Sequence, residues 1–295
     1  MNGLLLVNKP SGMTSHDVVS VVRRALNTRE VGHSGTLDPM ASGLMVLLIG
    51  EATKLSSYVT EGNKSYEVGL KLGVATDTLD TTGQVLTEKE VTCSDSEVTK
   101  SALALIGEMS LPIPIFSAKK IDGKKLYEYA REGESVEIPQ KVMKFWNVET
   151  RENHTFSLHC SKGSFIRSWV SLLGENLGCG AAMASLKRTS SHHDKLEDSI
   201  ELDRLKTLSA EDQSKLLVPL DQALVGAKSI RVHGQDEVLL KNGQISHSLR
   251  SQLISRFDPN VDELIQILPE KRGCLVALIG LEKGQGFKIK RVFNY

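Results

Sequence analysis

The sequence contains little from which a disulfide framework, a membrane span or an extended stacking surface could be built. Its longest apolar run, Leu44 to Ile49, is far shorter than the roughly 20 residues that cross a bilayer. Aromatic residues make up only 5% of the chain, so any surface for stacking bases must be small. The four cysteines form no CxxC pair, which argues against a zinc ribbon or a redox motif and favours free thiols in a reducing cytosol. These cysteines are Cys93, Cys160, Cys179 and Cys274.

A secretory signal and a net charge are also missing. The N-terminal apolar run is only Leu4 to Val7, with no positive segment before it, so we expect a cytoplasmic protein without membrane association. Lys and Arg number 36, as do Asp and Glu. This balance argues against a uniformly basic coat protein but leaves a localised basic groove open. With 40% hydrophobic and 24% charged residues among 295, the chain is globular and long enough for about two domains.

Several catalytic signatures are absent. There is no Walker phosphate loop, no HExxH and no His/Cys cluster with metal-ligand spacing, so the motifs indicate no nucleotide or metal site. Residues 178–183 begin a G-x-G-x-x-G motif but end in Met183. Residues 32–36 approach the G-x-S-x-G elbow but end in Thr36, which argues against a serine hydrolase.

The periodicity predicts an α+β fold, in which a mixed, largely antiparallel sheet is flanked by helices. Thr14 and Asp17 are spaced as a capping box at the start of a helix. Residues 29–43 have no periodicity and read as a loop. Strands are expected at residues 3–7, 44–49, 66–73, 142–148 and 155–160, and helices at residues 14–26, 97–109, 124–131 and 164–177.

The pattern changes near residue 229. Short strand-like pieces at 229–232, 273–279 and 286–292 surround a turn at Asn242-Gly243. We therefore predict two domains, 1–228 and a small β-rich module at 229–295.

Residues 32–39, in the loop between the first helix and the buried strand, carry one carboxylate, Asp38. A structural Asx turn at Asp38-Pro39 is a common use of this residue pair. Glycine-bearing loops inside compact domains are also often functional, so both interpretations stay open on the residues alone.

Residues 32–43, GHSGTLDPMASG, resemble the catalytic-loop motif of the bacterial TruB-type tRNA pseudouridine-55 synthases. The resemblance extends in order over roughly residues 3–225, and the tail resembles the family's PUA-type RNA-binding module. One departure is Leu111-Pro112-Ile113-Pro114, where the family usually has Gln-x-Pro-Pro. The further matching segments are 3–19, 64–66, 72–73, 76–83, 117–131 and 163–191.

The resemblance implies the pseudouridine synthase fold and isomerisation of the uridine at position 55, in the T-loop of tRNA. The N1–C1′ bond breaks, the uracil turns, and C5 joins C1′, with no cofactor. The target base must be extruded into the site. The implied partner is the T-arm of tRNA, and we expect a monomer.

The resemblance also implies roles for seven residues. Asp38 attacks C1′ or abstracts a sugar proton, so a covalent ester and a glycal route both stay open. Arg167 pairs with Asp38, and Tyr66 faces the base and assists removal of the C5 proton. The remaining four are His33, which holds RNA and displaces the base, Leu186 and Phe165, which line the pocket, and Asp80, which supports the site.

Each of these residues has a structural reading when taken alone. Tyr66 and Leu186 would be core residues, His33 a loop histidine and Arg167 a solvated helix residue. Phe165 stands where many family members have Tyr, so stacking is kept but a hydroxyl contact is lost.

The positions of basic residues indicate where the protein would contact RNA. The pairs Lys119-Lys120 and Lys124-Lys125 are candidate phosphate contacts, with a solvated face as the alternative, and residues 281–295 are also basic. Two other functions compete with the synthase, namely a non-catalytic RNA-binding protein on the same scaffold and a carboxylate-dependent glycosidase. Retention of Asp38, Tyr66 and Arg167 argues against the first. The second would need another catalytic carboxylate, which no feature identifies.

Overall fold

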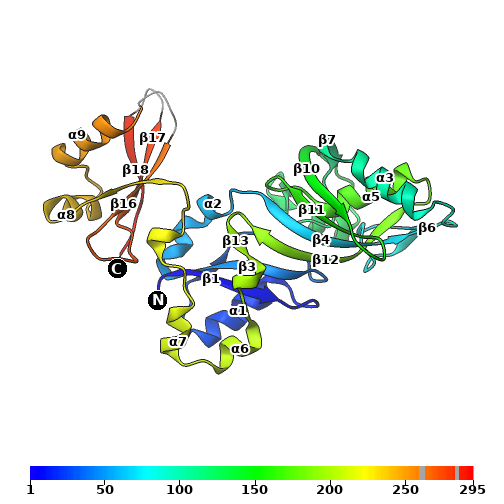
Figure 1. Cartoon of the computed structure of the whole chain (residues 1–295), viewed down its shortest axis with the longest axis horizontal. Helices are drawn as coiled ribbons and strands as arrows, with labels where there is room; N and C mark the ends of the chain where they lie inside the picture. Colours follow the sequence, from blue (N-terminus) through cyan, green and yellow to red (C-terminus); the bar gives the residue numbers. More distant parts are fainter. Residues whose placement is uncertain (259–262, 283–285, 295) are drawn as a thin grey trace.

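The structure is a computed structural model that describes residues 1–258, 263–282 and 286–294. The molecule is elongated, with a ten-stranded sheet along most of its length and a four-stranded sheet at one end (Figure 1). Neighbouring strands of the large sheet run antiparallel except β1 with β14 and β3 with β12, which are parallel. The predicted α+β class and the largely antiparallel sheet are therefore confirmed.

The large sheet has the strand order β14-β1-β3-β12-β4-β11-β10-β7, with β2 on β3 and β13 on β12. Its strands are β1 (Gly3–Lys9), β2 (Val31–His33), β3 (Ser42–Ile49), β4 (Lys64–Leu72), β7 (Gly107–Pro112), β10 (Gln140–Thr150), β11 (Thr155–Cys160), β12 (Ala181–Ser191), β13 (Asp194–Lys195) and β14 (Ile200–Glu201). The accompanying helices are α1 (Ser15–Ala25), α2 (Ser56–Val59), α3 (Asp95–Ala104), α4 (Leu126–Glu132), α5 (Ile166–Asn176), α6 (Leu202–Thr207) and α7 (Ala210–Lys215). Short elements complete this part: β5 (Val74–Thr76) with β6 (Val85–Glu88), β8 (Lys120–Ile121) with β9 (Lys124–Lys125), and the 3-10 turns η1 (Gly50–Leu55), η2 (Leu196–Asp198) and η3 (Leu220–Gln222).

The C-terminal part contains a parallel pair, β15 with β16, followed by two antiparallel pairings. Two helices that the sequence analysis missed pack here. Its elements are β15 (Lys228–Arg231), α8 (Gln235–Lys241), α9 (His247–Arg256), β16 (Glu263–Leu268), β17 (Ala277–Glu282) and β18 (Gly286–Val292).

The start of α1 follows directly from its sequence. Thr14 caps the helix, and both halves of the predicted capping box with Asp17 are formed. Val18, Val19 and Val22 fall on one face and are buried against the sheet. The helix therefore has a defined first turn, which matters because that turn contacts the loop bearing Asp38.

Two predicted elements need correction, and one strand was missed. The 29–43 segment is not all loop, because Val31–His33 pairs with β3. The helix expected at 97–109 ends at Ala104, and Gly107, with φ +125°, opens strand β7 instead. The strand β12 was missed because its Ala- and Ser-rich sequence has no alternation. Its position between β3 and β4 overrides that weak local preference.

Alternate residues of β1 and β3 serve two different cores. Leu5 and Met45 face α1 and join a core that extends along the sheet to Trp169 of α5. Leu4 and Leu44 face the other way and pack in one cluster with C-terminal residues, including the fully buried Phe293. The C-terminal part also has its own core around α8, α9 and its sheet.

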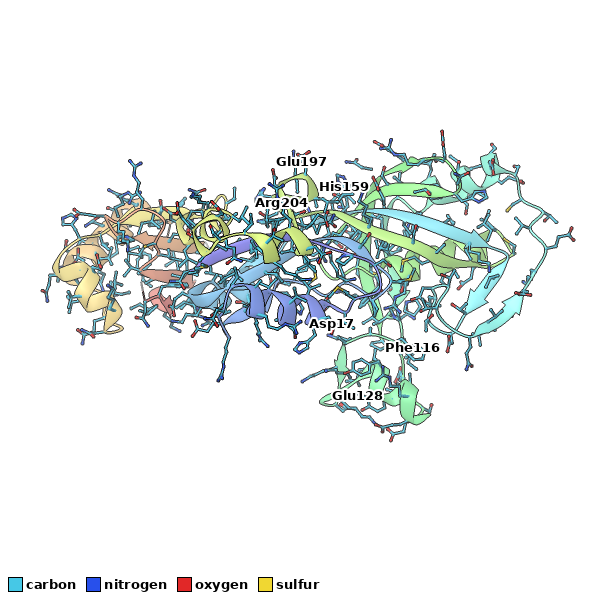
Figure 2. The ribbon with its side chains drawn as sticks, turned by 90° about the horizontal axis from the view of Figure 1, so that it is seen from below. Asp17, Phe116, Glu128, His159, Glu197 and Arg204 are labelled. Atoms are coloured by element: carbon cyan, nitrogen blue, oxygen red, sulfur yellow. The ribbon has the colours of Figure 1, made fainter. Side chains whose placement is uncertain are left out.

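A small segment made of β8, β9 and α4 projects from the body. Figure 2 shows it from another side, with Phe116 at its root and Glu128 on its helix. All four cysteines are free thiols, as predicted. No helix in the described ranges combines the length and the hydrophobicity needed to cross a membrane.

Candidate active site

A cavity of about 670 Å³ opens between the loop at residues 34–41, here called the Asp38 loop, and the start of α5. Pockets of this size are typical of sites for small ligands or single cofactors. Its walls combine apolar side chains with several cations. The lining residues used below are Asp38, Tyr66, Phe165, Arg167, Leu186 and Arg188.

Asp38 is gripped by Arg167 through both carboxylate oxygens. Arg167 Nε lies 3.0 Å from Oδ2, and Nη2 donates to Oδ1 at 3.2 Å. The Arg167 side chain is 5% exposed and that of Asp38 is 33% exposed, so the carboxylate keeps an open side toward the cavity. This fork-to-carboxylate geometry is the one in which Arg cannot be replaced by Lys without loss.

Arg167 is itself held from two further segments. Nη1 donates to the carbonyl of Thr78 and Nη2 to that of Phe116, each at 3.0 Å. The residue lies in the first turn of α5. The guanidinium therefore has a fixed orientation before any substrate binds.

The protonation of Asp38 reflects opposing influences. Burial raises the pKa of Asp38, the Arg167 charge opposes that rise, and Asp80 adds to it. The net pKa lies above the ordinary aspartate value. Arg167 is thus the main group that keeps the buried carboxylate ionised.

Asp80 is buried but does not line the cavity. Its Oδ1 accepts hydrogen bonds from the hydroxyl of Thr78 and from the backbone and hydroxyl of Thr82. The Thr78 carbonyl accepts a hydrogen bond from Arg167. Asp80 is therefore linked to Arg167 through the turn that contains Thr78. That placement matches a supporting role.

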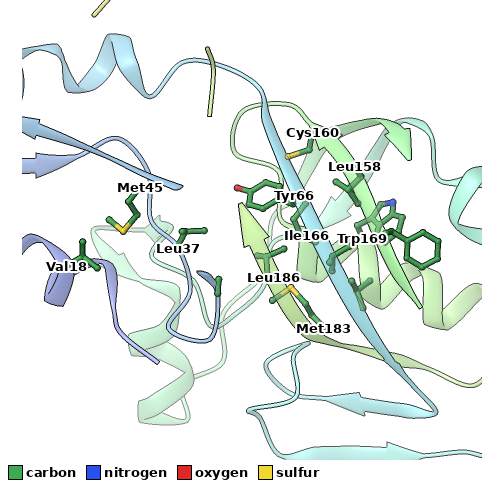
Figure 3. Close-up of a cluster of buried hydrophobic side chains, with 14 of the residues drawn as sticks. Val18, Leu37, Met45, Tyr66, Leu158, Cys160, Ile166, Trp169, Met183 and Leu186 are labelled. Atoms are coloured by element: carbon green, nitrogen blue, oxygen red, sulfur yellow. The ribbon is translucent and has the colours of Figure 1, made fainter. Parts of the chain in front are cut away.

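Tyr66 projects from β4 into the cavity and is 7% exposed. Figure 3 shows it in the same apolar cluster as Leu37, Ile166 and Leu186. Burial raises the pKa of Tyr66, while the charge of Arg188 opposes the rise.

Leu186 and Phe165 both line the cavity, as the sequence analysis expected of them. Leu186 is buried on β12 opposite Val68, and Phe165 is half-buried immediately before α5. Leu186 also belongs to the core, which fits its structural reading, and its role beside the substrate stays a prediction.

His33, like Asp80, is a predicted residue that does not line the cavity. It ends β2, and its Nδ1 accepts a hydrogen bond from Gly35 N at 3.3 Å. Burial and the nearby Arg188 lower the pKa of His33. It therefore supports the start of the Asp38 loop in this structure.

Sequence reasoning missed three buried cations around the Asp38 loop. Lys9 is fully buried, and its amine donates to the carbonyls of Pro10, Pro39 and Ala41. Burial is the main reason why the pKa of Lys9 is lowered to about 8. The other two, Lys64 and Arg188, are at most 8% exposed. All three lie in segments that carry the family resemblance, but no spacing rule reveals that they are buried.

The predicted phosphate contacts divide into two groups. Lys119 lines the cavity together with Lys141 and Lys162. Lys124 instead forms ion pairs with Glu132 and Glu134, which favours the alternative reading for this residue. In the basic tail, Lys288 and Lys290 pair with Glu282, and Lys283 lies outside the described residues. Among the described residues, no group of His, Cys, Asp and Glu has a geometry that could hold a metal ion.

The fold and the site define an enzyme that acts through one arginine-held carboxylate in a pocket sized for a small group. Residues 23–166 match the profile of the TruB family pseudouridylate synthase, N-terminal domain. Residues 167–225 match that of the tRNA pseudouridylate synthase B C-terminal domain. The chain is 54% identical to a protein of Bdellovibrio bacteriovorus named tRNA pseudouridine synthase B, over 100% of this chain and 97% of that protein.

A second relative with the same name, from Clostridium kluyveri, is 36% identical over 99% of this chain and 100% of its own. The chain belongs to the TruB family of pseudouridylate synthases, which confirms the resemblance drawn from its motifs. A solved H/ACA ribonucleoprotein bound to a substrate RNA containing 2′-deoxyuridine includes a chain of the same fold. That match has a TM-score of 0.65 and 20% identity, and it covers 99% of this chain and 85% of the other.

Proposed function

We propose that this protein converts the uridine at position 55, in the T-loop of tRNA, to pseudouridine. The observation that carries the proposal is the two-point contact between Arg167 and Asp38 at a cavity, in a chain whose curated relatives are tRNA pseudouridine synthases. The enzyme is an isomerase, so every carbon, nitrogen and oxygen atom of the uridine is retained in the product.

Asp38 begins the reaction. Its carboxylate either adds to C1′, forming an ester, or removes the 2′ proton, forming a glycal. In both routes the N1–C1′ electron pair leaves with the uracil. After the uracil turns, C5 bonds to C1′. In the ester route the C1′–O bond breaks and its electron pair returns to the Asp38 carboxylate, and in the glycal route C2′ takes its proton back from Asp38. Arg167 keeps the carboxylate ionised and aimed throughout.

The cavity requires that the target base leaves its stack, because Asp38 is not at the outer surface. Leu186 and Phe165 offer apolar walls to the extruded base, and Tyr66 faces it from β4. His33, at the start of the Asp38 loop, would contact RNA at the cavity rim, where it would help displace the base.

Recognition of the T-arm would use cations beside the cavity, and a monomer carries all of the proposed chemistry. Lys119, Lys141 and Lys162 lie where phosphates that flank the extruded nucleotide would pass. The C-terminal module, residues 229–295, would bind a more distant part of the tRNA. A cytoplasmic location follows from this substrate.

The test is incubation with unmodified tRNA followed by mapping of pseudouridine at single-nucleotide resolution. We expect one new pseudouridine, at position 55, and none in a tRNA with cytidine there. Tight binding without conversion would favour the non-catalytic RNA-binding alternative, and conversion at another position would overturn the proposed specificity.

A further inference from the structure

A buried arginine on β12 has no assigned role in the chemistry above. Arg188 is 2% exposed and lies between β3 and β4, where it is registered with Gly43 on one side and Tyr66 on the other. None of the ion pairs formed by described residues involves it. A buried guanidinium without a carboxylate is costly unless its donors are satisfied.

The donors of Arg188 reach two separate elements. Nε donates to the carbonyl of Leu44 on β3 at 2.7 Å, and Nη2 to that of Gly35 in the Asp38 loop at 3.3 Å. Tyr66, the register partner of Arg188 on β4, lines the same cavity as Arg188. One rigid group is therefore fixed to the Asp38 loop and shares the cavity with Tyr66.

The two carbonyl contacts fix the position of the Arg188 guanidinium, and its charge lowers the pKa of Tyr66. The titratable and charged groups that face Tyr66 are Arg188 from β12, Cys160 from β11 and Asp38 from its loop. Of these, only Arg188 favours the phenolate, because Cys160, Asp38 and burial all raise the pKa of Tyr66. Without Arg188, the pKa of Tyr66 would rise further, and less of Tyr66 would be in the phenolate form that accepts a proton.

We propose that Arg188 is a positioning residue for Tyr66: its fixed charge, registered opposite Tyr66, favours the phenolate that acts as the base and removes the proton from C5. This inference rests on the proposed function. It assigns Arg188 to one late step of the isomerisation, and the cleavage of the N1–C1′ bond does not depend on it.

The proton step is balanced within the site. Once C5 has bonded to C1′, it still carries its hydrogen, and N1 is an imine nitrogen. The Tyr66 oxygen takes the C5 proton, the C5–H electron pair forms the C5–C6 double bond, and the C6–N1 pair moves to N1. N1 then receives a proton, from Tyr66 or from water, which completes pseudouridine and restores the base.

The experiment compares Arg188→Gln with the parent on two tRNAs, one with uridine and one with 5-fluorouridine at position 55. Fluorine at C5 leaves no proton to remove, so the second tRNA reports only bond cleavage and C5–C1′ bond formation. General-base assistance contributes about 10²- to 10⁴-fold. We expect single-turnover conversion of uridine to fall by at least about 10²-fold, and rearrangement of 5-fluorouridine to stay within about threefold, since only the former needs the base.

Two further variants serve as controls for this comparison. Lys187→Gln, on the exposed side of the same strand, is the matched control and should convert both tRNAs at the parental rate. Arg188→Gln combined with Tyr66→Phe should be no slower on uridine than Tyr66→Phe alone, because the two residues act in one step.

The pH profile and a deuterium label supply readouts that a structural role would not move. Loss of the cation raises the pKa of Tyr66, so the rate of Arg188→Gln should keep rising to higher pH than that of the parent. A uridine deuterated at C5 should show a larger primary isotope effect with the variant. Equal slowing on uridine and 5-fluorouridine, with no added isotope effect, would overturn the proposal and assign Arg188 to the shape of the Asp38 loop.

Arg188→Lys keeps the experiment decisive if the Gln variant does not fold. It retains the cation and one donor, so it should show the same selective loss on uridine to a smaller extent. Failure of the parent to convert either tRNA would instead count against the proposed function itself.

Discussion

The contact between Asp38 and Arg167 concentrates the proposed chemistry in two side chains. It joins residues 129 positions apart in the chain, and each provides what the other needs. The carboxylate offers a nucleophile or base, and the planar fork keeps it ionised despite burial.

Replacing Asp38 with Asn should abolish isomerisation. The shape is nearly unchanged, but the charge and the nucleophile are removed. Because the proposed phosphate contacts lie elsewhere, tRNA affinity should stay within about tenfold of the parent. Single-turnover assays and filter binding measure the two quantities, and substantial residual turnover would show that Asp38 is not the reacting group.

Replacing Arg167 with Lys should slow catalysis by about 10²-fold or more, although the charge is kept, because an ammonium cannot reproduce the two-point contact. The same variant should lose activity at a higher pH on acidification than the parent. Asp38 must be ionised to act, and a weaker cation lets its raised pKa rise further. Parental turnover with an unshifted acid limb would contradict this account.

At the scale of elements, the start of α1 holds the Asp38 loop. The hydroxyl of Ser15 accepts from the backbone N–H of Leu37 at 2.9 Å and donates to the carbonyl of the same residue at 3.0 Å. Both contacts are buried. The capped first turn of a helix thus sets the position of a catalytic loop some 20 residues later.

Ser15→Ala should lower kcat and stability together, because it leaves a buried amide and carbonyl of the loop without partners. Such groups cost about 1–3 kcal/mol each. Thr14→Ala is the matched control, since it removes the cap of the same helix at a cost of about 1 kcal/mol without touching the loop. Chemical denaturation and single-turnover rates should separate the two, with only the Ser15 variant losing catalysis beyond its loss of stability.

At the scale of the whole molecule, neutral net charge and RNA binding are compatible because the cations are placed unevenly. We expect tRNA affinity to fall by at least about tenfold between about 50 and about 200 mM salt. Lys119→Gln, at the cavity, should reduce the slope of log affinity against log salt by about one. Lys195→Gln, whose ammonium pairs with Glu197, is the control and should leave that slope unchanged. A flat plot for the parent would remove the proposed basic surface.

The proposed module, residues 229–295, should contribute to tRNA binding and not to the chemical step. A chain ending at residue 228 keeps every proposed catalytic residue, so kcat at saturating tRNA should stay within about tenfold while KM rises. Removal also uncovers the apolar face where Leu4 and Leu44 pack with Phe293, so the melting temperature should fall.

The full-length variant Phe293→Ala separates the two effects of truncation. Burial of such a ring is worth about 3–5 kcal/mol, so this variant should lose stability while keeping a nearly parental KM. A folded, truncated protein with kcat lower by several orders of magnitude would show that the module takes part in the active site.

Local patterns in the sequence determined much of this protein. The capping box at Thr14, the alternation around Tyr66 and the buried run at 44–49 depend on neighbours a few residues away, and each formed as predicted. The motifs around Asp38 and Arg167 indicated the family and its chemistry. Only the tertiary structure decided that 181–191 is a central strand, that His33 stays off the cavity wall and that Lys9 and Arg188 are buried beside the site. Those outcomes depend on which strands become neighbours and on which carbonyls a cation reaches, and contacts between distant segments leave no periodic trace in the chain.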